Sequence, residues 1–241
     1  MPRFFILDAL TVGAIVALPE ALAHHIQVLR LAPNTLITLF NGEGGEYVAS
    51  LTSIEKKRVS AEVKAYAPRD VELPYAITLA QALPESSKMD WIIEKAVELG
   101  VATIAPLAAQ RCVVRLSSER AAKRHAHWQA IIVAASEQSG RNRLAHLAPL
   151  SDYQPWIAQQ DLHKRIILSP RAETSLAQWA RHQPPQAVTL VIGPEGGLTE
   201  SEENAALKHG ALALSMGPRI LRTETAGLAA LALINGMWGG M

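Results

Sequence analysis

Short apolar stretches separated by turn residues fill the first third of the chain. Asn41 to Gly45 is a polar, glycine-rich run typical of a hairpin turn, and residues from about 21 to 29 have the spacing of a helix. The segments that favour strands are Arg3 to Leu7, Leu36 to Phe40, Glu46 to Ser50 and Arg58 to Ala65. This pattern predicts a small β-barrel interrupted by one helix.

The run from Ala67 to Pro74 separates this region from the rest of the chain. It contains two prolines and alternating charges, which suit a linker better than the interior of a helix or strand. We therefore predict two domains, residues 1–72 and residues 73–241.

Strand-like and helix-like patterns alternate after the linker. Ser87 is a candidate helix cap, and Thr199 with Glu202 has the spacing of a capping box. Strands are expected at about 75–83, 101–105, 165–168, 187–192 and 211–215. Helices are expected at about 87–100, 118–138, 174–181, 199–210 and 223–237. Such alternation is the signature of an α/β fold with a mainly parallel sheet.

Three loops follow apolar strands: Leu168–Arg171, Gly193–Gly197 and Met216–Thr225. In parallel α/β sheets, ligands bind beyond the carboxyl ends of the strands, so these loops are expected to form one pocket. The three glycines of the second loop would let backbone approach a ligand. By itself this loop is a weak signal, because it matches neither a phosphate-binding loop nor the dinucleotide fingerprint, and a tight turn between a strand and a helix is the alternative. The third loop carries two arginines, a glutamate and two threonines, which packing alone does not require.

Composition narrows the class of protein. The 241 residues are 49% hydrophobic, enough for one large core and a small second domain. No run reaches the roughly 18 to 20 apolar residues of a membrane span. Asp8 follows an apolar run of only four residues, so no secretory signal is expected. Cys112 is the only cysteine, which excludes an internal disulfide and a thiolate zinc cluster. The adjacent His24 and His25 cannot share one face, so no metal is expected. A cytoplasmic protein fits best.

Charge is unevenly distributed, although the formal net charge is only +1. Between Arg111 and Leu147, seven basic residues stand against two acidic ones. This segment is either a solvated helix face or a phosphate-binding surface. The residues that we select from it as candidates for RNA contact are Arg111, Arg115, Lys123, Arg124, Arg141 and Arg143.

Two C-terminal motifs resemble the signature of the RsmE family of ribosomal RNA uridine-N3 methyltransferases. They are Gly193-Pro194-Glu195-Gly196-Gly197 and Gly217-Pro218-Arg219-Ile220-Leu221-Arg222-Thr223-Glu224-Thr225-Ala226. The similarity covers nearly the whole chain and includes His24-His25, Val28 to Leu31, Asn41 to Gly44, Lys95 to Val101 and Glu137 to Arg141. Asn34 replaces a usual glycine and Met216 a common leucine, and neither departure is expected to affect activity.

This resemblance implies a SPOUT-class α/β methyltransferase domain whose C-terminal segment threads a trefoil knot, preceded by a PUA-like β-barrel that binds RNA. It also implies a homodimer that transfers a methyl group from S-adenosylmethionine to N3 of a specific uridine in 16S ribosomal RNA, the small-subunit RNA. The cofactor pocket should then include Leu168, Gly193, Gly196, Met216, Gly217, Ile220, Leu221 and Arg222.

Catalysis at uridine N3 requires that its proton leave, because the protonated nitrogen is a poor nucleophile. Arg222 is the first catalytic candidate, since a guanidinium stabilises negative charge that develops on the base oxygens. Glu195 and Glu224 are candidate bases, provided that partial burial raises their pKa toward neutrality. The alternative for all three residues is a salt-bridge network that braces the loops.

Two other functions remain open. A non-catalytic RNA-binding protein would use only the barrel and the basic helix, although the intact third loop disfavours it. A SPOUT methyltransferase for transfer RNA would share the fold and cofactor, although the barrel-first order and the Glu137 to Arg141 motif favour ribosomal RNA. The sequence also leaves open whether naked RNA or the assembled small subunit is the substrate.

Overall fold

Two compact units make up the computed structural model, which describes residues 1–55, 58–85 and 87–240. The first unit is Met1–Glu72 with Ser136–Leu144, and the second is Leu73–Ala135 with Ala145–Met241. The predicted domain 1–72 matches the first segment of the first unit, but residues 136–144, which the sequence assigns to the second domain, group with the first unit by their contacts. Within the described ranges, no helix is both long and apolar enough to cross a membrane.

The first unit is built on a five-stranded sheet with strand order β1-β3-β4-β5-β2. Its elements are β1 (Arg3–Phe5), β2 (Ile15–Leu18), α1 (Glu20–Val28), β3 (Leu36–Phe40), β4 (Glu46–Ile54) and β5 (Val59–Ala67). Alternate residues of β5, Val59, Ala61 and Val63, are buried with Ile26 of α1, as expected for a sheet with one covered face. Because β1 and β2 are the two ends of this strand order, the predicted small β-barrel is a half-barrel sheet in the described residues.

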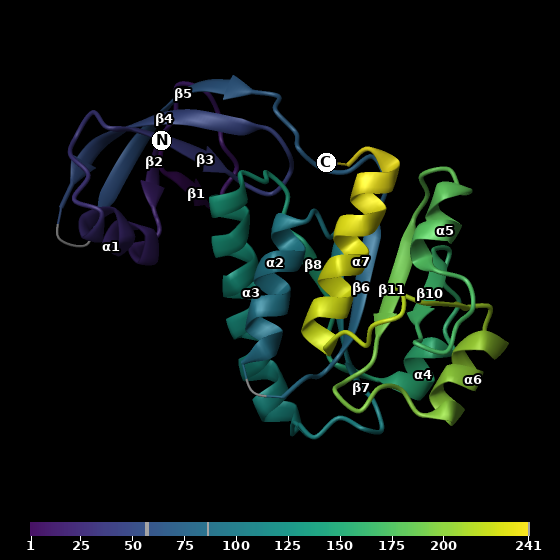
Figure 1. Ribbon diagram of the computed structural model, residues 1–241. Helices are drawn as coiled ribbons and strands as arrows, with labels where there is room; N and C mark the ends of the chain where they lie inside the picture. Colours follow the sequence, from purple (N-terminus) through teal and green to yellow (C-terminus); the bar gives the residue numbers. More distant parts are fainter. Residues whose placement is uncertain (56–57, 86, 241) are drawn as a thin grey trace. The chain divides into compact units, whose positions relative to one another are not determined.

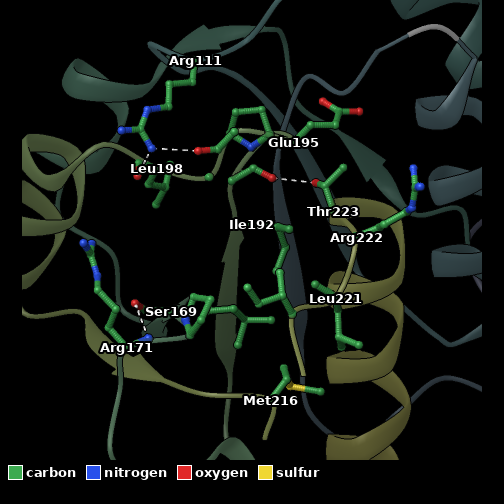
Figure 2. A pocket seen from close by; sticks show the side chains of 18 of the residues that line it. Arg111, Ser169, Arg171, Ile192, Glu195, Leu198, Met216, Leu221, Arg222 and Thr223 are labelled. Carbon is green, nitrogen blue, oxygen red and sulfur yellow. Dashed lines mark hydrogen bonds between the residues drawn. The ribbon is translucent and has the colours of Figure 1, made fainter. Parts of the chain in front are cut away.

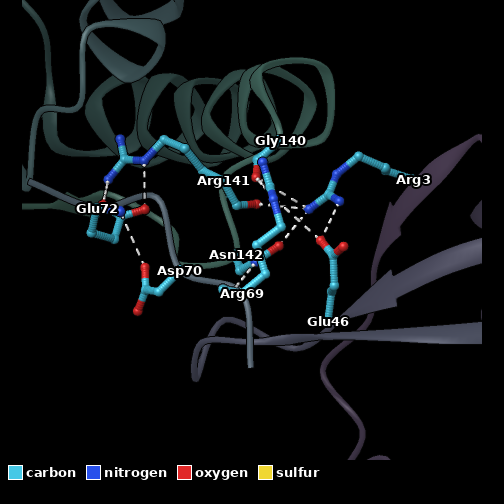
Figure 3. A network of polar contacts seen from close by, with 8 residues as sticks. All are labelled: Arg3, Glu46, Arg69, Asp70, Glu72, Gly140, Arg141 and Asn142. Carbon is cyan, nitrogen blue, oxygen red and sulfur yellow. Dashed lines mark hydrogen bonds and ion pairs between the residues drawn. The ribbon is translucent and has the colours of Figure 1, made fainter. Parts of the chain in front are cut away.

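Residues 136–144 join the first unit through a network of polar contacts (Figure 3). Arg3 pairs with Glu46 at 2.6 Å and donates to the carbonyl oxygen of Gly140 at 3.3 Å. Arg141 donates to both carboxylate oxygens of Glu72, and its Nε lies 2.9 Å from Oε1. These charge-assisted bonds hold the segment against the strands of the unit.

The second unit contains a parallel sheet with order β12-β10-β11-β6-β7-β8, and β9 also pairs with β7. Its strands are β6 (Ile77–Ala82), β7 (Thr103–Ala108), β8 (His146–Leu147), β9 (Ser151–Asp152), β10 (Lys164–Leu168), β11 (Val188–Ile192) and β12 (Leu212–Leu214). Its helices are α2 (Lys88–Glu98), α4 (Tyr153–Ile157), α5 (Leu176–Arg181), α6 (Glu200–Lys208) and α7 (Thr223–Trp238). Helix α3 (Ser118–Ser139) belongs to this unit up to Ala135, and its last residues are assigned to the first unit. The predicted α/β architecture with a mainly parallel sheet is confirmed.

The predicted helix caps are confirmed in full at α6 and in position only at α2. At α6, the side chain of Thr199 accepts from the backbone of Glu202, and the Glu202 carboxylate accepts from the backbone of Thr199. Ser87 does precede α2, but its side chain makes no capping hydrogen bond. The sequence also missed β2, β8, β9 and α4, because segments of two to five residues are too short to show periodicity.

The central strands β6 and β11 are buried along their whole length, and α7 packs against both of them (Figure 1). The residues of α7 that enter the core include Leu231, Ile234 and Trp238. Helix α2 lies beside α7 and contacts it. This packing brings the first turn of α7 to the carboxyl ends of the central strands, where the candidate site lies.

Candidate functional site

A cavity of about 540 Å³ lies between the loops that follow β10, β11 and β12 (Figure 2). This volume is within the range of roughly 300 to 1,000 Å³ typical of small-molecule sites. All eight residues proposed for the cofactor line it: Leu168, Gly193, Gly196, Met216, Gly217, Ile220, Leu221 and Arg222. Other residues that line the cavity, which the sequence did not assign to the cofactor, include Arg111, Ser169, Arg171, Ile192, Leu198, Glu203, Arg219, Thr223 and Ala226. The three loops therefore meet as expected from the direction of parallel strands.

The glycine loop Gly193–Gly197 is held by hydrogen bonds from two distant side chains, which Figure 2 shows. Thr223, the first residue of α7, donates from Oγ1 to the carbonyl oxygen of Gly193 at 2.6 Å. Arg111 donates to the carbonyl oxygens of Gly196 at 2.8 Å and Leu198 at 3.4 Å. Two carbonyl groups of the loop are thus fixed by side chains and do not need the ligand to satisfy them.

Glycine is required at two positions of the cavity wall. A Cβ atom on Gly193 would lie 2.8 Å from the backbone nitrogen of Leu198 and 3.0 Å from a backbone carbon of Gly197. Gly217 has a φ of +98°, a conformation that other L-residues rarely adopt. A side chain at Gly196 would instead meet only the flexible side chain of Arg111. The loops are therefore close-packed on themselves at Gly193, with backbone facing the cavity.

A buried glutamine of β6 supports the same wall. Gln81 is fully buried, and its Nε2 donates to Thr223 Oγ1 at 2.9 Å and to the carbonyl oxygen of Ala82. A chain of two hydrogen bonds thus runs from Gln81 through Thr223 to Gly193. No pattern in the sequence singles out Gln81, because one polar residue within an apolar strand does not indicate its partner.

Glu195 forms an ion pair with Lys88, a residue that no pattern in the sequence singles out. Its Oε1 accepts from Lys88 Nζ at 2.7 Å and from the backbone nitrogen of Glu85 at 3.0 Å. Partial burial by itself would raise the pKa of Glu195, but these hydrogen bonds outweigh it and lower the pKa below its ordinary value of 4.5. The condition set for Glu195 as a general base, a pKa raised toward neutrality, is therefore not met.

Glu224 follows Thr223 in the first turn of α7 and is not among the residues that line the cavity. Its Oε2 is buried, lies 3.9 Å from Lys88 Nζ and has no hydrogen-bond donor among the described residues. A buried oxygen is poorly placed to accept the N3 proton from an incoming uracil. The geometry therefore favours the alternative of a bracing network for Glu195 and Glu224.

Arg222 is exposed, lines the cavity and directly precedes α7. No hydrogen bond or ion pair of its guanidinium is found among the described residues, whereas Arg111 and Arg171 of the same lining are engaged with Gly196 and Glu203. An uncommitted guanidinium at the edge of a cavity is available to an anionic ligand group.

The basic residues proposed for RNA contact are divided between the two units. In the second unit, Arg111 supports the glycine loop, Arg115 donates to the carbonyl oxygen of Gln110, and Lys123 pairs with Glu119. Arg124 is exposed on α3 and has no such partner among the described residues. These four side chains are all exposed, so the hypothesis of a phosphate-binding surface remains open for them.

In the first unit, Arg143 is exposed and pairs with Asp70 at 3.0 Å. Arg141 is different, because it is buried and its Nε and Nη2 both donate to the carboxylate of Glu72. Breaking a buried pair leaves an uncompensated charge, so this arginine is unsuited to an RNA phosphate. We therefore remove Arg141 from the proposed RNA surface.

Two family models and several known proteins match this chain. Residues 71–235 match the family model of the RNA methyltransferase domain, and residues 18–64 match that of the RNA methyltransferase PUA domain. The ribosomal RNA small subunit methyltransferase E of Bacillus subtilis is 34% identical over 223 residues, which are 90% of this chain and 87% of the relative. The enzyme of the same name from Synechocystis is 32% identical over 94% of this chain and 74% of its own length.

Solved structures show the same similarity. The crystal structure of ribosomal RNA small subunit methyltransferase E from Neisseria gonorrhoeae, bound to S-adenosyl methionine, is 41% identical with a TM-score of 0.92 and covers 99% of this chain and 98% of that chain. A methyltransferase from Legionella pneumophila, also in complex with S-adenosyl methionine, is 35% identical with a TM-score of 0.90, covering 97% and 96% of the two chains. Because residues 71–235 match the methyltransferase family model and these relatives are more than 30% identical over most of both chains, the chain belongs to the ribosomal RNA small subunit methyltransferase E family.

Proposed function

We propose that this protein transfers a methyl group from S-adenosylmethionine to N3 of a uridine in 16S ribosomal RNA. The single observation that carries the proposal is the cavity: three loops from different strands meet there, in a fold shared with structures that bind S-adenosylmethionine. The names of the relatives support small-subunit ribosomal RNA as the substrate. The resemblance to uridine-N3 methyltransferases supports the choice of nitrogen.

The residues of the cavity fit such a cofactor. Ile192, Leu221 and Met216 supply apolar contacts (Figure 2). Gly193 and Gly217 also line the cavity, and because they have no side chains their backbone can contact the ligand directly. Apolar walls with a few polar groups are typical of ligand pockets. When bound, S-adenosylmethionine supplies an electrophilic methyl group, and this chain positions it against the base.

Arg222 remains our catalytic candidate. Its uncommitted guanidinium can stabilise the negative charge that develops on uracil oxygens as the N3 proton leaves. Because Glu195 is engaged by Lys88 and Oε2 of Glu224 is buried, neither glutamate is proposed as the base any longer. Loss of the proton to water, with the anion stabilised by Arg222, accounts for the reaction without a protein carboxylate.

We also propose that the C-terminal segment forms a trefoil knot. The chain leaves β12 beyond β10, passes the loop after β10 where Ser215 pairs with Ser175, and then returns to α7 on β6 and β11. Such a return past an earlier loop supports a knotted path. We further propose a homodimer, supported by the exposed apolar side chains of Trp91 on α2 and Met237 on α7. Ultracentrifugation of the purified chain tests the dimer.

RNA recognition is proposed to involve both units. The PUA match supports RNA binding by the first unit, and the exposed residues Arg111, Arg115, Lys123, Arg124 and Arg143 are the proposed phosphate contacts. Ribosomal RNA as substrate would place the enzyme in the cytoplasm. A transfer-RNA substrate is the alternative, and the experiment below includes it.

The deciding experiment is methyl transfer from labelled S-adenosylmethionine to separated 16S ribosomal RNA, assembled small subunits and bulk transfer RNA. The modified nucleoside is then identified and mapped. We expect label in N3-methyluridine of 16S RNA, either free or within the subunit. Label in transfer RNA, or in a different nucleoside, would contradict the proposal. A protein that binds RNA but transfers no label would support the non-catalytic alternative.

A further inference from the structure

Lys88 lies between two of the segments that form the cavity. It is the first residue of α2, and its ammonium nitrogen is 2.7 Å from Oε1 of Glu195 and 3.9 Å from Oε2 of Glu224. Glu195 belongs to the loop after β11, and Glu224 belongs to the first turn of α7. One cation therefore joins three elements that are far apart in the sequence.

Charges around Lys88 favour its ammonium form. The hydrogen bond with Glu195 is the main cause that raises the pKa of Lys88, and the carboxylates of Glu224 and Glu85 act in the same direction. The backbone nitrogen of Glu85 also donates to Glu195. The cluster thus contains one positive charge facing several negative ones, and the lysine prevents these carboxylates from repelling each other.

Partial burial makes this arrangement sensitive to the loss of Lys88. The side chains of Lys88, Glu195 and Glu224 are 28%, 30% and 18% exposed, so water screens them only in part. Oε2 of Glu224 has no hydrogen-bond donor among the described residues, which leaves the nearby ammonium as its main compensation. Without that charge, Glu195 and Glu224 would face each other as like charges, and the two segments would move apart.

We propose that Lys88 is a positioning residue that clamps the glycine loop to the first turn of α7 and so sets the width of the cofactor cavity. The inference rests on the proposed function for the identity of the ligand, S-adenosylmethionine. Gly196 follows Glu195 in the chain, and Thr223 precedes Glu224. Gly196 and Thr223 both line the cavity, so a change in the spacing between Glu195 and Glu224 moves its walls. A preformed cavity binds more tightly, because less order must be imposed on binding.

The test compares Lys88→Met and Lys88→Arg with Lys95→Met as the matched control. Lys95 lies on the same helix and pairs with Glu94 and Glu98, and neither of these partners lines the cavity, whereas Glu195, the partner of Lys88, does. We expect Lys88→Met to raise the Kd and the KM for S-adenosylmethionine at least tenfold, with kcat at saturating cofactor within about threefold of the parent. Lys88→Arg should largely restore affinity, and Lys95→Met should match the parent.

A second variant distinguishes a charge clamp from simple packing. Adding Glu195→Gln to Lys88→Met removes one of the two facing negative charges, so we expect the double variant to bind cofactor more tightly than Lys88→Met. Unchanged affinity in Lys88→Met overturns the proposal. So does a loss of kcat without a loss of affinity, which would place Lys88 in the chemistry. Failure of the double variant to improve binding also overturns it.

Amide hydrogen exchange in the ligand-free protein separates this inference from the proposed function. Lys88→Met should speed exchange at residues 193–198 and 222–226 relative to Lys95→Met. If the parent binds no S-adenosylmethionine, the proposed function fails, yet faster exchange at these residues still supports the clamp. Unchanged exchange there refutes the clamp whatever the ligand is. If Lys88→Met does not fold, Glu195→Gln gives the same comparison, because it removes the negative charge that lies 2.7 Å from the ammonium while keeping the lysine.

Discussion

Oγ1 of Thr223 lies 2.6 Å from the carbonyl oxygen of Gly193, so the first residue of α7 is bonded to the loop after β11. The same hydroxyl accepts a hydrogen bond from Gln81 of β6. Because the hydroxyl acts as donor and acceptor at once, it connects the central strand, the glycine loop and the C-terminal helix. Hydrogen bonds within the protein itself therefore hold this wall of the cavity in place.

Replacement of Thr223 by valine tests this connection. Valine keeps the branched shape but cannot donate to Gly193, and an unmade hydrogen bond at a buried group costs about 1 to 3 kcal/mol. Binding must then re-impose the shape of the wall on a loosened loop. We expect about 1.4 kcal/mol of this cost to appear in binding, so Thr223→Val should bind S-adenosylmethionine roughly tenfold more weakly. Thr223→Ser keeps the hydroxyl and should bind like the parent. Calorimetry showing equal affinity in all three proteins would contradict the role of the bond.

Gly193→Ala tests how tightly the glycine loop packs. The added Cβ would lie 2.8 Å from the backbone nitrogen of Leu198, which is not free to move aside. We expect a loss of unfolding free energy of about 1 to 3 kcal/mol in urea, as for other overpacked sites. Gly236→Ala is the control, because its Cβ would meet nothing within 4 Å inside α7 and should stabilise by about 0.5 to 1 kcal/mol. Equal stability of Gly193→Ala and the parent would show that the loop yields.

Arg222→Ala tests the proposed stabilisation of the uracil anion. Removal of one fixed donor to a developing negative charge lowers kcat by roughly 100-fold to 1,000-fold in other enzymes. We expect a loss of this size in single-turnover methylation, with cofactor affinity within about threefold of the parent. An arginine with a purely structural role would instead lower stability or cofactor affinity first. Parent-like turnover by the folded, cofactor-saturated variant would remove Arg222 from the chemistry.

Arg124→Gln tests the RNA surface of α3. A side chain that contacts a phosphate releases counterions on binding, so its loss should lower the slope of log affinity against log salt by about one. Filter binding with 16S RNA fragments at several salt concentrations gives this slope. Arg181, exposed at the end of α5, provides the matched control, and Arg181→Gln should leave the slope unchanged. If both variants keep the parent's slope, α3 presents only a solvated face.

The ion pair of Glu195 predicts a dependence of stability on pH. Despite the opposing effect of burial, hydrogen bonds from Lys88 and from the backbone hold the pKa of Glu195 below its ordinary value of 4.5. A carboxyl group with a lowered pKa in the folded state stabilises the protein above that ordinary value, and this contribution is lost as pH falls through the lowered pKa. The difference in Tm between the parent and Glu195→Gln should be constant from about pH 6 to 8 and shrink below about pH 4. A difference that grows toward low pH would contradict this assignment.

Local patterns in the sequence determined much of the architecture. Thr199 and Glu202 form the capping box that their spacing predicted, and β3 and α3 lie where alternation and helical spacing placed them. Both features depend on residues a few positions apart, so the chain carries them locally. The order of strands and loops also predicted that the three ligand loops would converge, because parallel strands end at one edge of a sheet.

Only the tertiary structure decided which partners the charged and polar side chains take. Lys88 reaches Glu195 across 107 residues and Arg111 reaches Gly196 across 85, and no local pattern records such a pairing. The same is true of Arg141, which the sequence grouped with surface arginines although it is buried against Glu72. A run of basic residues reports charge, but whether each charge faces solvent, a carboxylate or a carbonyl depends on how distant elements pack. The sequence alone therefore indicated where the cavity lies and which family it resembles, while the packing of α2 and α7 determined what holds that cavity in shape.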